Sequence, residues 1–237
     1  MRRLRLRERS LRSARSWSFP KRVFRFALLE EWPAGWAWNI PGSPLHGESV
    51  ARDEPDEMAF MEALIARLIG QHGADLCRIH VRGFSGGARL ASHLMASMTN
   101  RLASVCCVSG VRFVESSPGQ LPPLLAIHGG LDALNPYEGG SEPRWSESVE
   151  SVVYPWAGAS GCEPPPKYRT LSEQVREVRY IDTTGFAAVR LITVEDAAHS
   201  WPGTLHRDHI EQFGAPGSFS ASQAYWDFVY EVDLIRS

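Results

Sequence analysis

The 237-residue chain contains no apolar run near the roughly 18 residues that a membrane-spanning helix needs, so no such helix is expected. Its four cysteines, Cys77, Cys106, Cys107 and Cys162, form no CxxC pair and no zinc-like spacing. The first 25 residues also lack the apolar segment of a secretory signal. Composition therefore predicts neither a membrane span nor a cysteine-based metal site, and it leaves the compartment open.

Acidic residues are nearly absent from residues 1–25, where Glu8 stands against nine arginines and Lys21. This segment carries a net +9, and because the whole chain carries −2, the remainder carries −11. Such a basic arm could bind nucleic acid, but no aromatic or structural motif accompanies the arginines. We therefore expect residues 1–22 to be a disordered arm without nucleic-acid binding, followed by a single α/β domain over residues 23–237.

Apolar runs and helical patterns alternate along that domain. We expect a doubly wound, mostly parallel sheet with helices on both faces. The predicted strands are 23–29, 79–82, 103–109, 121–128, 176–182 and 187–194, and the predicted helices begin near residues 53, 86, 145 and 220. Pro155 and Gly158 are expected to end the third helix.

The segment from Arg78 to Leu90 joins a β-branched run to a helix-forming tract through Gly83-x-Ser85-x-Gly87, which is the spacing of a nucleophile elbow. Glycines are needed two positions either side of the serine, because larger side chains would collide where strand and helix cross. We expect the Ser85 hydroxyl at the C-terminal edge of the sheet, with the Gly86 N–H directed at an oxyanion. The alternative is a Gly/Ser turn without chemistry.

A serine nucleophile needs a base to take its proton and a carboxylate to orient that base. In sheets of this kind, functional side chains follow the strands. Asp132 follows the predicted strand 121–128, and His199 follows the predicted strand 187–194. The resulting order Ser85, Asp132, His199 is that of α/β-hydrolases and predicts a catalytic triad.

Other ionisable residues fit the triad less well. His80 lies inside the predicted elbow strand, where a structural role is expected, and His128 is placed to shape the acid loop. Glu195 and Asp196 are rival acids, but they precede His199 by only four and three residues, which makes the geometry awkward.

A metal site is conceivable at His206, Asp208 and His209, which lie in a short polar segment. No fourth ligand accompanies them, so no metal is predicted.

The triad residues belong to segments that together resemble the polyhydroxybutyrate depolymerase and feruloyl esterase family of α/β-hydrolases, over about residues 23–233. The segments that carry the resemblance are Gly83-Phe84-Ser85-Gly86-Gly87, His128-Gly129 with Asp132 and Pro136-Tyr137, Gly161-Cys162, His199-Ser200-Trp201-Pro202-Gly203, Trp38-Asn39, Asp56-Glu57 and Ser220-Ala221-Ser222.

The resemblance implies a serine carboxylesterase that uses Ser85 as nucleophile, His199 as general base and Asp132 as its orienting acid. It implies hydroxyalkanoate oligomers or polymers, or feruloyl and acetyl esters, as substrates, and no cofactor. Trp201, Trp36 and Trp38 are candidates for the walls of the substrate site. Family members are often exported.

The chain departs from the family's pattern before the aromatic loop. There the family has earlier strands and a His-Gly segment that completes the oxyanion hole, whereas Leu45 to Gly47 lies on the wrong side of that loop. We expect an N-terminally truncated domain with an exposed sheet edge that allows homodimerisation. The alternative function is a hydrolase-like binding or interaction protein with weak or absent catalysis, because one lost oxyanion donor lowers the rate about a hundredfold or more.

Overall fold

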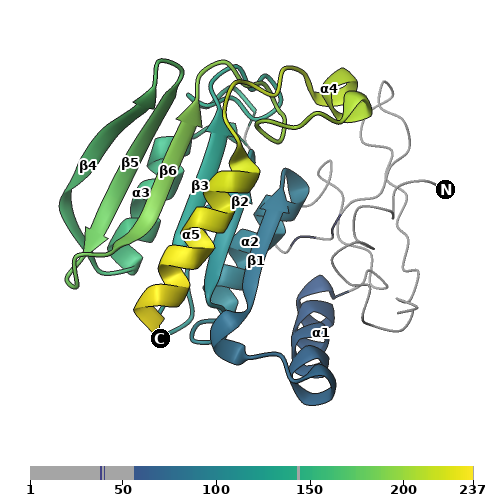
Figure 1. Cartoon of the computed structure of the whole chain (residues 1–237), viewed down its shortest axis with the longest axis vertical. Coiled ribbons are helices and arrows are strands. Elements are labelled where there is room, and N and C mark those ends of the chain that lie inside the picture. The colour runs from purple at the N-terminus through teal and green to yellow at the C-terminus, as the bar shows by residue number, and fades with distance from the viewer. Residues whose placement is uncertain (1–37, 39, 41–55, 143–144, 237) are drawn as a thin grey trace. The chain divides into compact units, whose positions relative to one another are not determined.

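The computed structural model describes residues 38, 40, 56–142 and 145–236 (Figure 1). The predicted basic arm, the predicted strand 23–29, Trp36 and the segment Leu45 to Gly47 lie outside the described residues. In the part of the chain that is described, no helix has the length and apolar character to cross a membrane.

The described residues form a six-stranded sheet in the order β1-β2-β3-β6-β5-β4. The strands are β1 (His80–Phe84), β2 (Ser104–Val108), β3 (Leu124–Gly129), β4 (Cys162–Ser172), β5 (Val175–Asp182) and β6 (Ala187–Val194). The pairs β1–β2, β2–β3 and β3–β6 are parallel, whereas β5 pairs antiparallel with both β6 and β4. The mostly parallel α/β architecture predicted from the sequence is therefore confirmed, with an antiparallel extension on one side.

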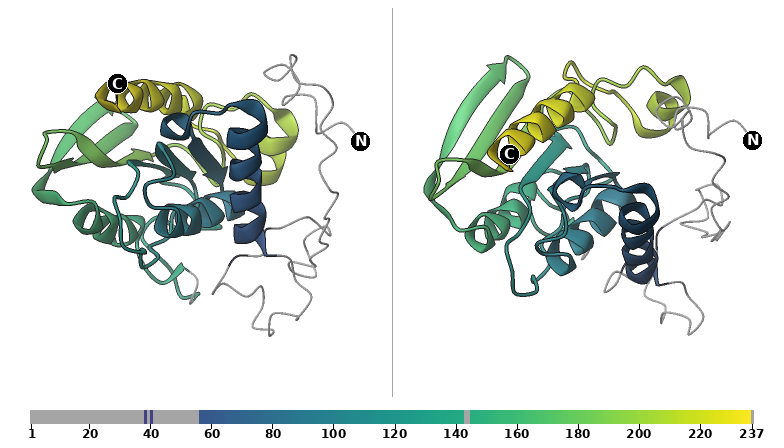
Figure 2. Two further views of the ribbon diagram at one scale, coloured as in Figure 1. Left: turned by 90° about the horizontal axis from the view of Figure 1, so that it is seen from below. Right: turned by 60° about the horizontal axis from the view of Figure 1, so that its bottom comes forward.

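Helices cover both faces of this sheet (Figure 2). The helices are α1 (Glu57–His72), α2 (Gly86–Ser97), α3 (Val149–Ala159), α4 (Arg207–Phe213) and α5 (Ala221–Arg236), with a short 3-10 turn η2 (Leu76–Arg78) before β1. The α1, α2 and α3 side chains join one core cluster, and α5 covers a second cluster on the opposite face.

Side chains of the central strands alternate between the two cores, as the pleat of a strand requires. Cys107 faces the α2 side and Cys106 faces α5, and neither is exposed. Burial raises the pKa of both thiols, that of Cys107 to about 12. All four cysteines are free, and these two act as small apolar core residues.

Polar side chains and a glycine set the ends of two helices. Asp56 caps α1 by accepting the Ala59 N–H at 2.9 Å, and Gly73 ends that helix with φ of 64°. Ser220 accepts the Gln223 N–H at 3.2 Å before α5. The Gln223 amide donates to Asp227 instead of returning to Ser220, so only half of a capping box forms.

The prediction that Pro155 ends the third helix is wrong. Helix α3 continues through Pro155 to Ala159. An interior proline costs a helix about 3 kcal/mol. That loss is offset because Val153 and Trp156 are fully buried beside it and the Trp156 indole donates to Arg112 O at 2.9 Å.

Two further elements were not predicted. Strand β4 begins with Cys162 and includes three prolines, Pro164 to Pro166. Proline has no N–H to donate, and a sheet tolerates it in an edge strand such as β4, where the outer side pairs with no other strand of the sheet. Helix α4 occupies the segment that the sequence suggested was a polar loop.

A buried arginine ties α5 to the sheet. Arg190 on β6 lies directly opposite Arg179 on β5, and Glu231 of α5 forms an ion pair with Arg190. The hydrogen bond from Arg190 lowers the pKa of Glu231. Because the Arg190 side chain is only 7% exposed, its positive charge would be buried without a counter-charge if Glu231 were absent.

We expect Glu231→Gln to lower the free energy of unfolding by about 1 to 2 kcal/mol at pH 7, because Arg190 loses its counter-charge. The value is below that of a fully buried pair, since the Glu231 side chain is 45% exposed. A carboxyl group whose pKa is lowered in the folded state stabilises the fold at pH values above its unfolded pKa. The difference in stability between the wild type and Glu231→Gln should therefore vanish as the pH falls below about 4. Urea unfolding at pH 7 and pH 3 measures it.

Asp227→Asn is the matched control, because Asp227 is exposed on the same helix and, among the described residues, accepts a hydrogen bond only from the Gln223 amide. An Asp227→Asn protein as unstable as Glu231→Gln would show that the ion pair is not the cause.

Candidate active site

Ser85 lies on a strained turn between β1 and α2. Its φ of 53° and ψ of −118° are sparsely populated for a residue with a side chain. The turn is held on both sides, because the Ser85 N–H donates to Val108 O at 2.9 Å and Ser85 O accepts from the N–H groups of Ala88 and Arg89. The predicted strand–turn–helix context of the serine is therefore present.

The close crossing of strand and helix depends on Gly83 more than on Gly87. A Cβ added to Gly83 would lie 2.1 Å from Gly87 O, whereas a Cβ on Gly87 would meet nothing closer than Trp38 Nε1 at 3.8 Å. The expectation that glycine is required sterically on both sides of the serine is therefore wrong for Gly87. Gly110, which no sequence motif singles out, is also required, because a Cβ there would lie 2.4 Å from Ser85 O.

Asp132 occupies the loop after β3 and is 4% exposed. One carboxylate oxygen accepts the N–H groups of Leu134 at 3.0 Å and Asn135 at 2.7 Å. The other lies 2.8 Å from His199 Nδ1 and 3.3 Å from His128 Nε2. Burial opposes ionisation, but these hydrogen bonds outweigh it and lower the pKa of Asp132 to about 2.

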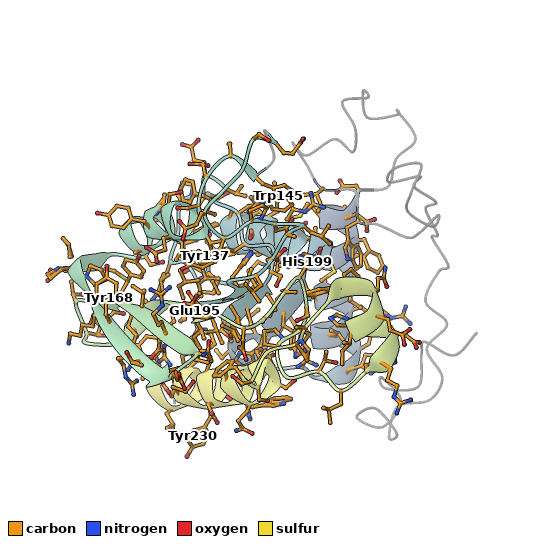
Figure 3. The ribbon with its side chains drawn as sticks, turned by 90° about the horizontal axis from the view of Figure 1, so that it is seen from above. Tyr137, Trp145, Tyr168, Glu195, His199 and Tyr230 are labelled. Atoms are coloured by element: carbon orange, nitrogen blue, oxygen red, sulfur yellow. The ribbon has the colours of Figure 1, made fainter. Side chains whose placement is uncertain are left out.

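His199 follows β6 and completes the line of hydrogen bonds. Its Nδ1–H donates to Asp132, which leaves Nε2 as an acceptor 2.9 Å from Ser85 Oγ. Figure 3 looks onto the end of the sheet where His199 lies. The three residues predicted from strand ends, Ser85, Asp132 and His199, are thus brought together by β1, β3 and β6.

The acid and histidine loops are locked to each other through backbone contacts. Leu131 N–H donates to Ala197 O at 2.9 Å, and a Cβ on Gly129 would lie 2.3 Å from the same oxygen. Asn135 Nδ2 donates to Ser109 O at 2.6 Å, and Ser109 has a positive φ of 52° at the end of β2. The sequence contained no motif that signalled these contacts, because they join loops far apart in the chain.

The Gly86 N–H is the candidate oxyanion donor on the described residues. As the first residue of α2, Gly86 has an N–H without an intrahelical acceptor, and it directly follows Ser85. Leu45 to Gly47, which lies after the aromatic loop where the family's His-Gly segment would precede it, is outside the described residues.

The predicted substrate-wall tryptophans differ in their surroundings. Trp38 is 39% exposed, and its indole nitrogen lies near Gly87 at the start of α2. Trp201 donates its indole N–H to Ser222 Oγ at 3.0 Å and packs against the α5 core cluster. These contacts place Trp38 beside α2 and tie Trp201 to α5.

Competing groups are engaged elsewhere. Glu195 forms an ion pair with Arg176 and is not part of the triad. His80 contacts Ser104 and Asp233, in keeping with a structural role. Within the described ranges, no group of three or more His, Cys, Asp or Glu side chains is arranged to hold a metal ion.

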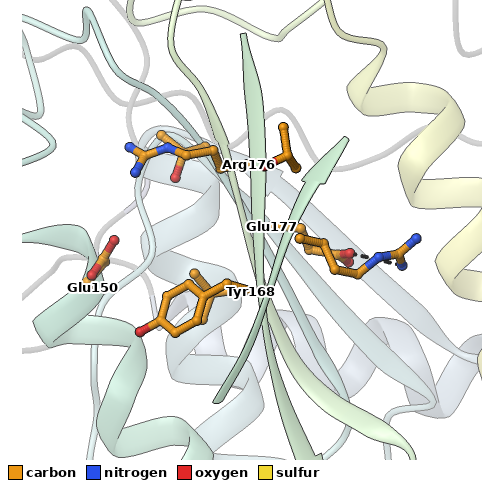
Figure 4. A pocket seen from close by; sticks show the side chains of 8 residues that line it. Glu150, Tyr168, Arg176 and Glu177 are labelled. Carbon is orange, nitrogen blue, oxygen red and sulfur yellow. Dashed lines mark hydrogen bonds and ion pairs between the residues drawn. The ribbon is translucent and has the colours of Figure 1, made fainter. Parts of the chain in front are cut away.

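A pocket also opens between α3 and the β4–β5 hairpin (Figure 4). Its lining includes Glu150, Tyr168 and Arg176, and none of its lining residues belongs to the triad. One lining residue, Thr193, has its hydroxyl 2.8 Å from the hydroxyl of the buried Tyr137.

The parallel strands, the elbow after β1 and the serine, aspartate and histidine at three strand ends define an α/β-hydrolase fold. No protein-family model matches the chain. A curated protein of Nocardia uniformis subsp. tsuyamanensis, named "Putative esterase NocK", is 27% identical over 202 residues, covering 75% of this chain and 56% of that protein. The chain thus spans little more than half the length of this relative.

Two solved structures show distant similarity. An acetyl xylan esterase from Aspergillus awamori aligns with a TM-score of 0.48 and 17% identity, covering 66% of each chain. Esterase PE8 aligns with a TM-score of 0.39 and 16% identity, covering 69% of this chain and 64% of that chain.

The two elbow glycines give a paired test of the site's geometry. We expect Gly83→Ala to lower the free energy of unfolding by about 3 kcal/mol or more, because the new methyl group would overlap the Gly87 backbone. Gly87→Ala should be neutral or stabilise by up to about 1 kcal/mol, since alanine favours a helix. Chemical denaturation measures both, and equal destabilisation of the two variants would contradict the crossing geometry.

Proposed function

We propose that this protein is a serine carboxylesterase that hydrolyses esters through an acyl-serine intermediate. The observation that carries the proposal is the continuous hydrogen-bond line from Ser85 Oγ through His199 to the buried, ionised Asp132. The sequence similarity to the protein named "Putative esterase NocK" supports the same reaction class.

In the proposed reaction, Ser85 Oγ attacks the ester carbonyl carbon while His199 Nε2 takes the hydroxyl proton. The Gly86 N–H donates to the oxyanion that forms. His199 then gives its proton to the leaving alcohol, which leaves an acyl-serine. A water molecule, deprotonated by His199, attacks this acyl group; the bond to Ser85 Oγ then breaks, His199 returns the proton to Oγ, and the acid leaves. Asp132 keeps the proton of His199 on Nδ1 throughout, so that Nε2 faces the serine.

For substrates, we propose hydroxyalkanoate oligomers or polymers, or feruloyl and acetyl esters. This choice rests on the resemblance of the Ser85, Asp132 and His199 segments to the depolymerase and feruloyl esterase family. The half-exposed Trp38 beside α2 supplies an aromatic surface near the nucleophile, and Phe84 and Phe213 lie against the His199 ring.

Ser85→Ala and His199→Ala should each lower kcat on a short-chain p-nitrophenyl ester by about a thousandfold or more, since neither leaves an activated nucleophile. The matched control is Ser97→Ala at the end of α2, where the hydroxyl is exposed and, in the described part of the chain, donates only to His93 O. It should keep wild-type turnover. A folded wild-type protein no faster than Ser85→Ala would instead favour the non-catalytic, hydrolase-like alternative.

Asp132→Asn should lower kcat about 10,000-fold while the protein remains folded. The Asn carbonyl oxygen can still accept the Leu134 and Asn135 N–H groups, which directs the amide nitrogen at His199 and disfavours the required tautomer. Steady-state kinetics measures the loss.

The same variant tests the acid stability of the wild type. Because the folded pKa of Asp132 is depressed to about 2, its carboxylate stabilises the fold above the unfolded pKa of about 4, and that contribution is lost as the pH falls toward 2. The wild-type advantage in urea unfolding should therefore shrink between pH 5 and about 2. A constant difference would show that Asp132 is not ionised in the folded protein.

A further inference from the structure

His209 on α4 contacts the loop that carries the proposed general base. The backbone N–H of Trp201, two residues beyond His199, donates to His209 Nε2 at 2.9 Å. An imidazole nitrogen accepts a hydrogen bond only when it is unprotonated, so His209 is neutral with its proton on Nδ1. The contact therefore exists only in one protonation state of His209.

Two phenylalanines lie against both histidine rings. The centroid of Phe84 is 5.2 Å from that of His199 and 5.1 Å from that of His209. The corresponding distances from Phe213 are 5.6 Å and 4.8 Å. Because Phe84 directly precedes Ser85, this aromatic cluster joins the nucleophile turn, the base and His209.

The segment that follows α4 supports the same loop. Ala215 O accepts from Ala198 N–H at 2.8 Å and from the Ser200 hydroxyl at 2.9 Å, on either side of His199. Trp201 follows Ser200 directly, and its backbone N–H donates to the titratable side chain of His209 and not to a backbone carbonyl. His209 is thus the pH-sensitive member of an otherwise permanent set of supports.

We propose that neutral His209 is a positioning residue for His199, and that protonation of His209 releases the Trp201 N–H and adds a second acid limit to turnover. The proposal rests on the proposed esterase function, because it concerns the base of that reaction.

The charges around His209 favour its neutral form. Burial lowers the pKa of His209, and the charges of His199 and His206 lower it further. The charged side chains of its own helix, Arg207, Asp208 and Glu211, are exposed. From β1, the uncharged Phe84 faces the ring, and the guanidinium of Arg82 lies over the Trp201 indole at 5.6 Å.

The kinetic test compares three variants over the acid limb of the pH profile. His209→Gln can place an amide oxygen near the Nε2 position, so kcat should stay within about threefold of the wild type. The acid limb of log kcat should steepen beyond slope one in the wild type, where His209 can be protonated, and should keep slope one in this variant. His209→Leu cannot accept the Trp201 N–H, and its kcat should fall about tenfold with little change in KM.

His206→Gln is the matched control. His206 is exposed beside α4 and has no side-chain capping bond, so this variant should keep a limb steeper than slope one, with the His209 midpoint moved slightly upward because the charge of His206 is gone. Wild-type kinetics and pH dependence in His209→Leu, or a single-slope limb in the wild type, would overturn the proposal.

An NMR titration, which does not depend on esterase activity, tests this inference independently of the proposed function. In the wild type, the NMR shift of the Trp201 backbone amide should titrate with the same midpoint as the His209 ring, and in His209→Gln it should be flat. Should the wild type lack esterase activity while Trp201 follows His209, the proposed function fails and the contact stands. A Trp201 amide that ignores the His209 titration rejects the inference, even if His209→Leu does not fold.

Discussion

The close crossing of β1 and α2 at Gly83 is the constraint on which the site depends. Because Gly83 has no Cβ, the backbone of Gly87 can lie where a methyl group would otherwise be. The turn between them then holds Ser85 at a positive φ and leaves the Gly86 N–H at the start of a helix. Gly110, at the end of the neighbouring strand, gives Ser85 O its space.

The parallel register of the central strands brings the other two residues to the same end of the sheet. β3 and β6 are neighbours, and Gly129 pairs with Val194 at the point where both strands end. Asp132 and His199 follow within a few residues, and the two loops bond through Ala197 O. The fold thus converts a separation of 67 residues into a hydrogen bond of 2.8 Å.

Much of this arrangement could be predicted because it depends on local patterns. The strands around Val105, Leu125 and Ile192 have apolar runs, and the elbow has its own glycine spacing. Because the three candidate residues follow the elbow strand and two of these apolar strands, the order of the strands along the chain also predicts the order Ser85, Asp132, His199. What could not be predicted depends on tertiary contacts. Burial of Trp156 carries α3 through Pro155, and the edge position of β4 accommodates its prolines.

The supports of the site were hidden for the same reason. Asn135 and His209 belong to no motif, and each acquires its role only when a distant loop presents a partner, Ser109 O in one case and Trp201 N–H in the other. Periodicity and spacing report on neighbours along one element, whereas these bonds join loops. Sequence patterns therefore identify Ser85, Asp132 and His199 more readily than the residues whose hydrogen bonds hold them in position.

The three site residues are not held equally. Ser85 is fixed by the backbone of a strand–helix turn, and Asp132 by two N–H bonds to one carboxylate oxygen. His199 has neither kind of restraint: among the described residues, its ring is hydrogen-bonded only to Asp132 at Nδ1 and to Ser85 at Nε2. Its position must therefore come from the loop around it, which makes the segment from α4 to Gly217 part of the site although it supplies no reacting atom.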